Sequence, residues 1–350
     1  MTRIARLAGR SDLISSLPYV LGFHPRQSVV MVFLKEKRVC ATLRGDLLES
    51  VHPWEPLPPE MTLPMNAVFR RERPDTVILV IFDETSHSFR GLLSQVTRAC
   101  RHAGVRIGDR LLVADGRWRS LDCRDSSCCP VTGRPLAAPD AVPAVAEWVS
   151  LGVSPLSDRE AVTSFFDSPA VGAFDVESPR PAPRRAIASW RREGLDAWAR
   201  VLGVGPTGAS RDPVDGLDEA CAQAAVDVLT DIPTRDALMA WLCPDLCDPA
   251  TYPRGLAELI EQCCGSVASV HDTRDPTELT WRLRDFARLL PPVAQAGVLS
   301  LVGAHSWWLG EGAFARAALE RAVQLDPGYT LAALLLQLVA AGVRARPGCA

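Results

Sequence analysis

The pattern of apolar and polar positions changes character along the chain. Over residues 1–135, short runs rich in β-branched side chains alternate with stretches of helical spacing. These two patterns are typical of buried strands and of amphipathic helices. Over residues 185–350, helical spacing alone appears between the Gly, Pro and Asp breaks. We therefore predict an α/β N-terminal domain with a mixed sheet, followed by an all-α C-terminal domain.

The first strands are predicted as a hairpin beside a central strand. Residues 28–34 (SVVMVFL) and 38–43 are separated by the charged Lys35-Glu36-Lys37, which predicts a turn between two strands. After a Pro-rich loop at 52–64 and a short helical stretch, residues 76–82 (TVILVIF) form an unbroken apolar run. Such a run indicates a strand that is buried on both faces. We expect it at the centre of the sheet.

The next elements predict a crossover and a second hairpin. Apolar residues recur three and four positions apart over 86–102, which indicates an amphipathic helix ended by Gly104. The strand at 110–114 would then lie parallel to the central strand. Asp115-Gly116 before residues 117–121 is a strong signal for a tight antiparallel turn.

Residues 136–184 are expected to connect the two domains. This Pro- and Ala-rich segment predicts only short helices, at 141–150 and after Ser157-x-x-Glu160, which matches a capping box. The Pro-rich stretch at 178–184 lacks the amide donors that helices and central strands need, and we interpret it as a linker. In the domain that follows, helices are expected at 185–202, 218–230, 234–242, 256–268 and 275–290.

The end of the chain, residues 296–341, resembles a tetratricopeptide hairpin. One repeat and the first helix of a second cannot form the concave groove of a repeat array. We interpret the hairpin as a packing element or cap, with a surface for a protein partner as the alternative. Small and large residues fall where the repeat needs close helix approach, a turn, core contacts and a stop, at Gly303, Gly310, Ala315, Leu319, Ala322 and Pro327.

Charge and hydropathy narrow the class of partner. The 350 residues include 38 basic and 41 acidic side chains, a net charge of -3, so bulk charge does not favour nucleic acid or an anionic membrane. All but two of the basic residues are Arg, so doublets such as Arg191-Arg192 are expected on solvated helix faces. The longest apolar stretch, 331–343, is too short to span a membrane, and no signal-peptide pattern opens the sequence. We expect a cytoplasmic protein.

The spacing of the cysteines says more about disulfide or metal binding than their number does. An odd count of 11 in a long chain argues against a disulfide framework. The doublets Cys128-Cys129 and Cys263-Cys264 do not reproduce the C-x2-C knuckle of zinc sites. Cys123 with Cys128 and Cys129, in a loop bounded by Gly and Pro, is the best candidate for metal, but a fourth ligand must come from elsewhere. We predict no cofactor and expect packed thiols, with zinc as the alternative.

Chemistry-bearing side chains follow the predicted central strand. Asp83, Glu84 and His87 stand there, and ligands of open α/β sheets bind beyond the carboxyl ends of parallel strands. Two carboxylates and an imidazole can hold a divalent cation or act as acid and base. Acidic residues are also the ordinary start of a helix, so capping is the alternative.

A second group stands in the loop that enters the first strand. His24, Arg26 and Gln27 lie in the sequence GFHPRQS. An imidazole and a guanidinium beside an aromatic can line a pocket. A turn that contains Gly and Pro before a buried strand needs no ligand to explain it, so local hydrogen bonding is the alternative.

Known catalytic motifs are absent from the sequence. Gly203, Gly205 and Gly208 form a G-x-G-x-x-G string, but it follows a helix instead of a strand, and we interpret it as an interhelical loop. There is no Ser-centred elbow, HExxH motif or P-loop.

Three stretches of the chain resemble one uncharacterised family. SSLPYVLGFHPRQSVVMVF, DGRWRSLDCRDSSCCPVTGRPL and ALERAVQLDPGYTLAALLLQ are similar to parts of an actinobacterial family catalogued as domain of unknown function 4192. Together they span nearly the whole chain. The resemblance implies a cytoplasmic protein of that group and no established activity. The family more often has an acidic residue where Gln27 stands, so a role that needs a carboxylate there is not expected.

The leading hypothesis is a non-enzymatic binding or regulatory protein. A small ligand or partner would meet the α/β domain near His24, Arg26 and Asp83, and the helical domain would support contacts with a protein partner. The alternative is an enzyme of unrecognised type that acts at the strand-end carboxylates, with or without a metal.

Overall fold

The computed structural model describes residues 9–47, 56–84, 89–150, 154–167, 174–205, 213–244, 246, 253–273, 276–343 and 345. The chain divides into two compact units. The first comprises the chain up to Ala161 and a short C-terminal stretch, and the second runs from Val162 to Val339. This division falls inside the predicted connecting segment. The three-part boundaries at 1–135, 136–184 and 185–350 stay a prediction.

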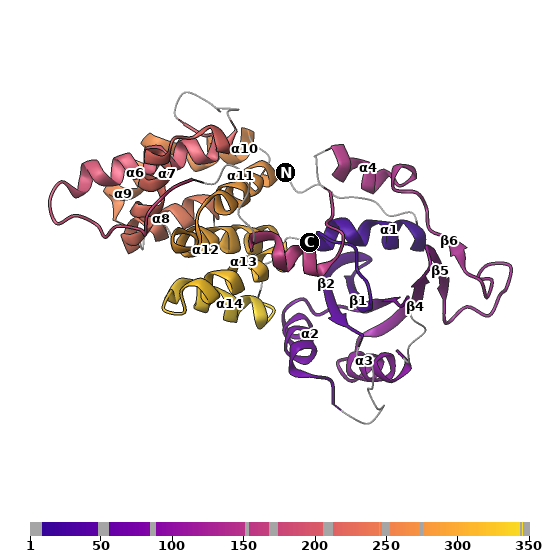
Figure 1. The fold of residues 1–350 in the computed structure, drawn as a ribbon. Coiled ribbons are helices and arrows are strands. Elements are labelled where there is room, and N and C mark those ends of the chain that lie inside the picture. Colours follow the sequence, from indigo (N-terminus) through magenta and orange to yellow (C-terminus); the bar gives the residue numbers. More distant parts are fainter. Residues whose placement is uncertain are drawn as a thin grey trace. The chain divides into compact units, whose positions relative to one another are not determined.

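The first unit is built on a six-stranded mixed sheet (Figure 1). The spatial order is β2-β1-β3-β4-β5-β6, with β3 and β4 parallel and the other neighbours antiparallel. The two predicted hairpins and the central position of β3 are therefore confirmed. Its strands are β1 (Ser28–Lys35), β2 (Arg38–Asp46), β3 (Thr76–Phe82), β4 (Arg106–Ala114), β5 (Arg117–Ser120) and β6 (Arg134–Pro135).

The tight turn between β4 and β5 has the backbone that its sequence requires. Asp115 has a φ of 49° and Gly116 a φ of 68°. A two-residue turn with both central residues in the left-handed region matches the twist of a hairpin. Asp and Gly both adopt this left-handed backbone readily. The sequence does not predict the early start of β4 at Arg106 or the short strand β6.

Helices cover both faces of the sheet (Figure 1). Helix α1 (Arg10–Leu21) packs Leu13, Ile14 and Leu17 on the face that carries Val30 and Leu111. Helices α2 (Pro59–Arg71) and α3 (Arg90–His102) cover the other face. Burial on both faces explains why β1 and β3 are almost uniformly apolar.

Prolines account for two differences between the predicted and the observed helices of this unit. Helix α1 contains Pro18 and is not predicted, and α2 begins at Pro59, inside the loop expected at 52–64. A proline at the first helical position lacks only an amide that would have no partner in the helix, so it can start a helix as well as end one.

The connecting segment forms α4 (Pro143–Ser150) and α5 (Arg159–Thr163). The predicted capping box is wrong. The Asp158 carboxylate accepts the Ala161 amide at 2.8 Å, and the Ser157 hydroxyl bonds to Asp158 instead of to the helix. Aspartate is as good a cap as serine, so the local sequence offers two choices.

Helices are the regular elements among the described residues of the second unit, which contain no strand. Gly265, with a φ of 89°, breaks the helix predicted at 256–268 into two. None of the described helices is long and apolar enough to cross a lipid bilayer. The α-helices are α6 (Ile187–Leu202), α7 (Glu219–Asp227), α8 (Ile232–Leu242), α9 (Arg254–Cys264), α10 (Val267–Thr273), α11 (Pro276–Leu289), α12 (Pro292–Leu309), α13 (Gly312–Leu325) and α14 (Thr330–Ala340).

The last helices approach each other at the small residues that the sequence places there. A Cβ built on Gly303 of α12 would lie 2.5 Å from Cγ of Leu319 on α13. Gly310 ends α12 with a φ of 86°. The close approach and the turn are as expected, whereas the tetratricopeptide assignment itself stays a prediction.

Candidate functional site

Several strand ends meet at one end of the sheet. Ser28 of β1 lies opposite Asp46 of β2 and Phe82 of β3. The Asp83 amide donates to the Val113 carbonyl of β4 at 3.1 Å. The carboxyl ends of the parallel pair therefore lie beside the start of β1. We call this the strand-end site and define it by His24, Arg26, Ser28, Arg44, Asp46, Asp83 and Glu84.

The structure brings two of the predicted site residues together. Arg26 Nε lies 3.8 Å from Glu84 Oε1, and the two side chains are 61% and 52% exposed. Asp83 is buried, with 4% of its surface exposed. His87 lies outside the described residues. The site thus combines a loose surface ion pair with a buried carboxylate.

The other two predicted residues hold the loop in place through their backbones. The His24 amide donates to the Leu156 carbonyl at 3.0 Å, and the Leu47 amide donates to the Gln27 carbonyl at 2.9 Å. Partial burial, and then the charge of Arg26, lower the pKa of His24 below its ordinary value. The imidazole is therefore neutral at neutral pH.

Sequence reasoning missed two residues at this end of the sheet. Ser28 is fully buried, and within the described part of the chain its Oγ has no hydrogen-bond partner. The Arg44 side chain is 12% exposed, pairs with Asp46 and lies over Phe23, with Cζ 6.0 Å from the ring centroid. Burial lowers the pKa of Arg44. Ser28 opens an apolar run and Arg44 is one Arg among many, so neither stands out in the sequence.

The second candidate site is the thiol cluster, which consists of Cys123, Cys128 and Cys129. The loop after β5 turns at Asp125, whose carbonyl accepts the Cys129 amide at 2.7 Å. All three Sγ atoms lie within 4.8 Å of one another, and those of Cys128 and Cys129 are 3.9 Å apart. Cys129 is buried and the other two are half-buried. The cluster is of a kind that can hold a metal ion.

A buried polar network supports the thiol cluster. Ser120 Oγ donates to Asp109 Oδ1 at 2.6 Å and accepts from the amides of Asp122 and Cys123, each at 3.2 Å. Arg10 forms an ion pair with Asp109. Asp109 and Ser120 are 5% and 4% exposed. The network ties α1 and β4 to the residues that precede the first cysteine.

The surroundings of the cluster shift the pKa values of its thiols in different directions. A hydrogen bond from the Ser120 backbone is the main cause that lowers the pKa of Cys129, and the charge of Arg10 acts in the same direction. The neighbouring Cys129 raises the pKa of Cys128. In the core of the same unit, burial raises the pKa of Cys100 to about 12. Cys129 is thus a thiol whose ionised form the protein favours.

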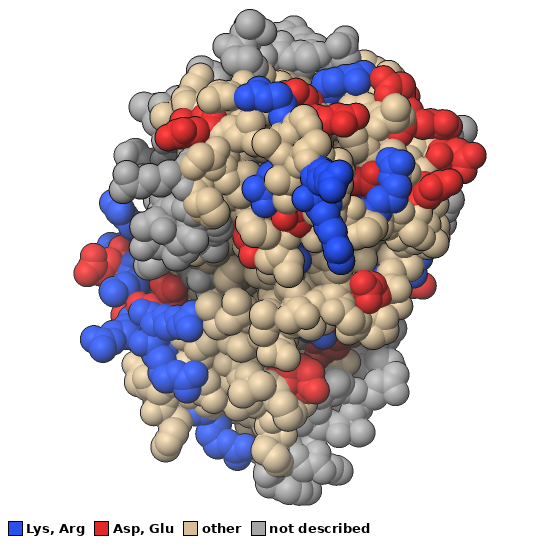
Figure 2. Space-filling view, turned by 90° about the vertical axis from the view of Figure 1, so that its left-hand side faces the viewer, with Lys and Arg blue, Asp and Glu red and all other residues tan. Residues whose placement is uncertain are grey.

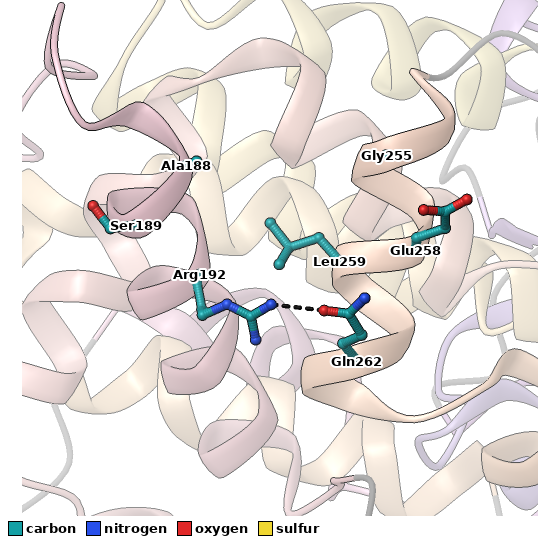
Figure 3. Close-up of a pocket in the computed structure, with 7 residues that line it drawn as sticks. All are labelled: Ala188, Ser189, Arg192, Gly255, Glu258, Leu259 and Gln262. Carbon is teal, nitrogen blue, oxygen red and sulfur yellow. Dashed lines mark hydrogen bonds between the residues drawn. The ribbon is translucent and has the colours of Figure 1, made fainter.

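A shallow groove lies between α6 and α9 of the helical unit (Figure 3). Arg192 Nη2 donates to Gln262 Oε1 across it at 2.6 Å. The lining pairs no nucleophile with a general base, so we assign no chemistry to the groove. Its lining residues are Ala188, Ser189, Arg192, Gly255, Glu258, Leu259 and Gln262.

Charged side chains of both signs share the surface of the molecule. On the face that Figure 2 presents, basic and acidic residues are interspersed among uncharged ones. This distribution agrees with the near balance of 38 basic and 41 acidic residues in the chain.

Comparison with known proteins gives a family. A family model described as "Domain of unknown function (DUF4192)" matches residues 11–346. The matched region includes both the strand-end site and the thiol cluster. No curated protein and no solved structure matches the chain. The function must therefore be argued from the chemistry of the two sites.

Proposed function

We propose that this chain, which belongs to the DUF4192 family of unknown function, is a non-enzymatic binding protein for a small polar ligand. The ligand would bind at the strand-end site. One observation carries the proposal: the Ser28 hydroxyl is buried at this end of the sheet with no hydrogen-bond partner among the described residues.

The physical argument is the cost of an unpartnered polar group. A buried donor or acceptor without a hydrogen bond costs roughly 1–3 kcal/mol. Arg44 Nε is also buried and has no partner in the described chain. Arg44 lies opposite Val30, and Val30 and Ser28 point to the same face of β1, so both polar atoms lie on one side of the sheet. Neither atom has exposed surface, so a ligand would reach them only when neighbouring side chains turn aside, and its bonds to them would then recover part of this cost.

The charged rim supports binding over catalysis. The 3.8 Å between Arg26 and Glu84 exceeds the distance of about 2.8 Å in a charge-assisted hydrogen bond. Either side chain can therefore turn toward a ligand at little cost. Because Glu84 already faces a cation, it acts as a counter-ion, and a rim with both signs of charge suits a ligand that has both donors and acceptors.

The proposal is tested by a thermal-shift screen of the full-length protein against polar metabolites, with mass spectrometry of small molecules that co-purify. We expect one chemical class to raise the melting temperature. Ser28→Ala and Arg26→Ala should each weaken its binding about ten-fold, the effect of one hydrogen bond. Arg38→Ala, at the exposed opposite end of β2, is the matched control and should bind like wild type. If no compound shifts the melting curve and none co-purifies, the proposal is wrong.

The enzyme alternative makes a different prediction for the same protein. Turnover in a hydrolase and nucleotide panel that disappears in Asp83→Asn would favour it over simple binding. Binding without turnover in both proteins would remove it. The protein partner expected for the helical unit stays a prediction.

A further inference from the structure

We propose that the thiol cluster binds one Zn²⁺ ion, with Cys123, Cys128 and Cys129 as thiolate ligands and the fourth position left to an exchangeable ligand. Zn–S bonds of about 2.3 Å in tetrahedral geometry place neighbouring sulfurs about 3.8 Å apart. The Sγ atoms of Cys128 and Cys129 are 3.9 Å apart, and all three pairs lie within 4.8 Å. Rotamer adjustments of about 1 Å or less complete the geometry.

The loop holds its cysteines in place before any metal arrives. Asp125 Oδ1 accepts from the amide and the hydroxyl of Ser127, at 2.9 Å and 2.7 Å. Arg134 Nη2 donates to the Ser127 carbonyl at 3.0 Å, and Arg117 Nη2 donates to the Gly133 carbonyl at 2.8 Å. A site whose backbone is already ordered loses less entropy when it binds an ion.

The network beneath the loop has the composition of a second coordination shell. Ser120 fixes the Cys123 amide, and Asp109 in turn fixes Ser120. Three thiolates around Zn²⁺ leave a net charge of about -1. The guanidinium of Arg10 interacts electrostatically with Cys128 and Cys129 and opposes that charge. Such outer partners orient the ligands and commonly change metal affinity 10- to 100-fold.

Packing or a disulfide explains the cluster less well than a metal does. Structural thiols are usually buried, whereas Cys123 and Cys128 are half-buried. A disulfide uses two sulfurs and leaves the third without a role, but all three converge here. A disulfide is therefore the competing outcome of the test.

The position of the cluster near the surface indicates an open fourth site. Among the described residues, it supplies three ligand atoms, one from each cysteine. Two of these residues are half-buried, so water or a group from another molecule can reach the ion. Structural zinc sites are closed by four protein ligands, and sites with three keep an exchangeable position.

The test is a metal titration of the reduced, chelator-treated full-length protein. Zn²⁺ is titrated in competition with a chromophoric chelator, and Co²⁺ serves as a spectroscopic probe because thiolate ligands give it charge-transfer absorption. We expect one ion per chain and sulfur-to-cobalt bands. Cys123→Ser and Cys128→Ser should each weaken Zn²⁺ binding by more than about 100-fold. Cys40→Ser is the matched control: Cys40 is in the same unit, 6% exposed, and outside the cluster.

A variant beside the cluster separates ligation from folding. Ser120→Ala should weaken Zn²⁺ binding about ten-fold and leave the stoichiometry and the cobalt spectrum unchanged. Each of three results overturns the proposal: no Zn²⁺ binding by the reduced wild type, equal affinity in Cys128→Ser and wild type, or sulfurs that close into a disulfide even with Zn²⁺ present. The cobalt spectrum of the wild type reports thiolate ligation even if a variant fails to fold.

Discussion

Two cysteine doublets in this chain share a sequence pattern but differ in backbone conformation, in their neighbours and in the exposure of their first residue. Cys128-Cys129 lies in a loop, with the sulfur of Cys123 within 4.8 Å. Cys263-Cys264 ends α9, and its residues are 3% and 0% exposed. Burial raises the pKa of Cys263 to about 12 and raises that of Cys264 as well. The doublet is therefore not a motif in itself, because its surroundings decide what its thiols can do.

The backbone explains the difference. Adjacent residues on a helix do not face each other, so α9 directs its two thiols to different neighbours. Cys264 Sγ lies 3.8 Å from the Leu195 carbonyl, whereas Cys263 interacts with Asp196. In the loop, the turn at Asp125 returns the chain and brings Cys128 and Cys129 back to Cys123. A turn can gather sulfurs that a helix separates.

The largest expected contrast is in stability, when a carboxylate replaces one thiol in each doublet. Cys264→Asp places a charge at a fully buried position and should lower the free energy of unfolding by about 4 kcal/mol or more. Cys128→Asp should leave the free energy of unfolding nearly unchanged, because Cys128 is half-buried at the surface. Urea unfolding of both variants and wild type measures the contrast. Equal losses would show that the loop is as tightly packed as the helix.

The next contrast is chemical reactivity in the native protein. The thiolate is the reactive form, and a buried thiol reacts only after the structure opens. Maleimide at neutral pH should modify Cys123 and Cys128 at least about 100-fold faster than Cys263 and Cys264. Peptide mass spectrometry over time gives the four rates, and added Zn²⁺ should protect only the first pair. Comparable rates in these two pairs of cysteines would contradict the difference in burial.

Local signals account for the part of the fold that could be predicted. The unbroken run TVILVIF identifies β3, and Asp115-Gly116 identifies the turn between β4 and β5, because each signal lies within the element itself. Helix α1 has a weaker signal, since Pro18 interrupts its apolar pattern. The segment is helical because packing on the sheet buries its apolar side chains, and the sheet lies outside the segment.

Long-range packing explains why the candidate sites were harder to predict than the fold. Arg10, Asp109 and Ser120 are ordinary in their own segments and meet because β4 pairs with β5 and α1 packs on the same face. The same holds for Ser28, whose burial depends on its neighbours in β2 and β3. The three cysteines could be singled out by their spacing, but spacing does not give the direction of a side chain in a loop.

A smaller effect should follow when the network beneath the loop is cut. Asp109→Ala removes the acceptor of the buried Ser120 hydroxyl. The free energy of unfolding should fall by about 1–3 kcal/mol. Amides at 121–129 should then exchange hydrogen faster, while those of α9 should not change, because Asp109 belongs to the other unit. Hydrogen-exchange mass spectrometry measures both regions. Asp109→Asn keeps an acceptor oxygen and is the control, and an equal effect of Ala and Asn would mean that the hydrogen bond is not what holds the loop.

The smallest effect concerns a charge pair at the surface beside the first cysteine. Arg110 Nε lies 3.0 Å and 3.1 Å from the two carboxylate oxygens of Asp122, and this bonding lowers the pKa of Asp122 below its ordinary value. A carboxyl whose folded pKa is lowered stabilises the protein above its unfolded pKa of about 3.9, and this stability is lost as pH falls through the folded pKa. The side chains are 35% and 37% exposed, so solvent screening keeps the contribution well under about 1 kcal/mol.

Arg110→Gln should therefore raise the pKa of Asp122 toward its ordinary value, which carboxyl carbon NMR measures directly. At neutral pH Asp122 is ionised in both proteins, so the variant should bind Zn²⁺ almost as tightly as wild type. A large loss of Zn²⁺ affinity in this variant would mean that the exposed ion pair, and not the buried network of Asp109 and Ser120, holds the thiol cluster in place. The two cysteine doublets would then differ because of a surface charge, and not because the loop folds its cysteines together.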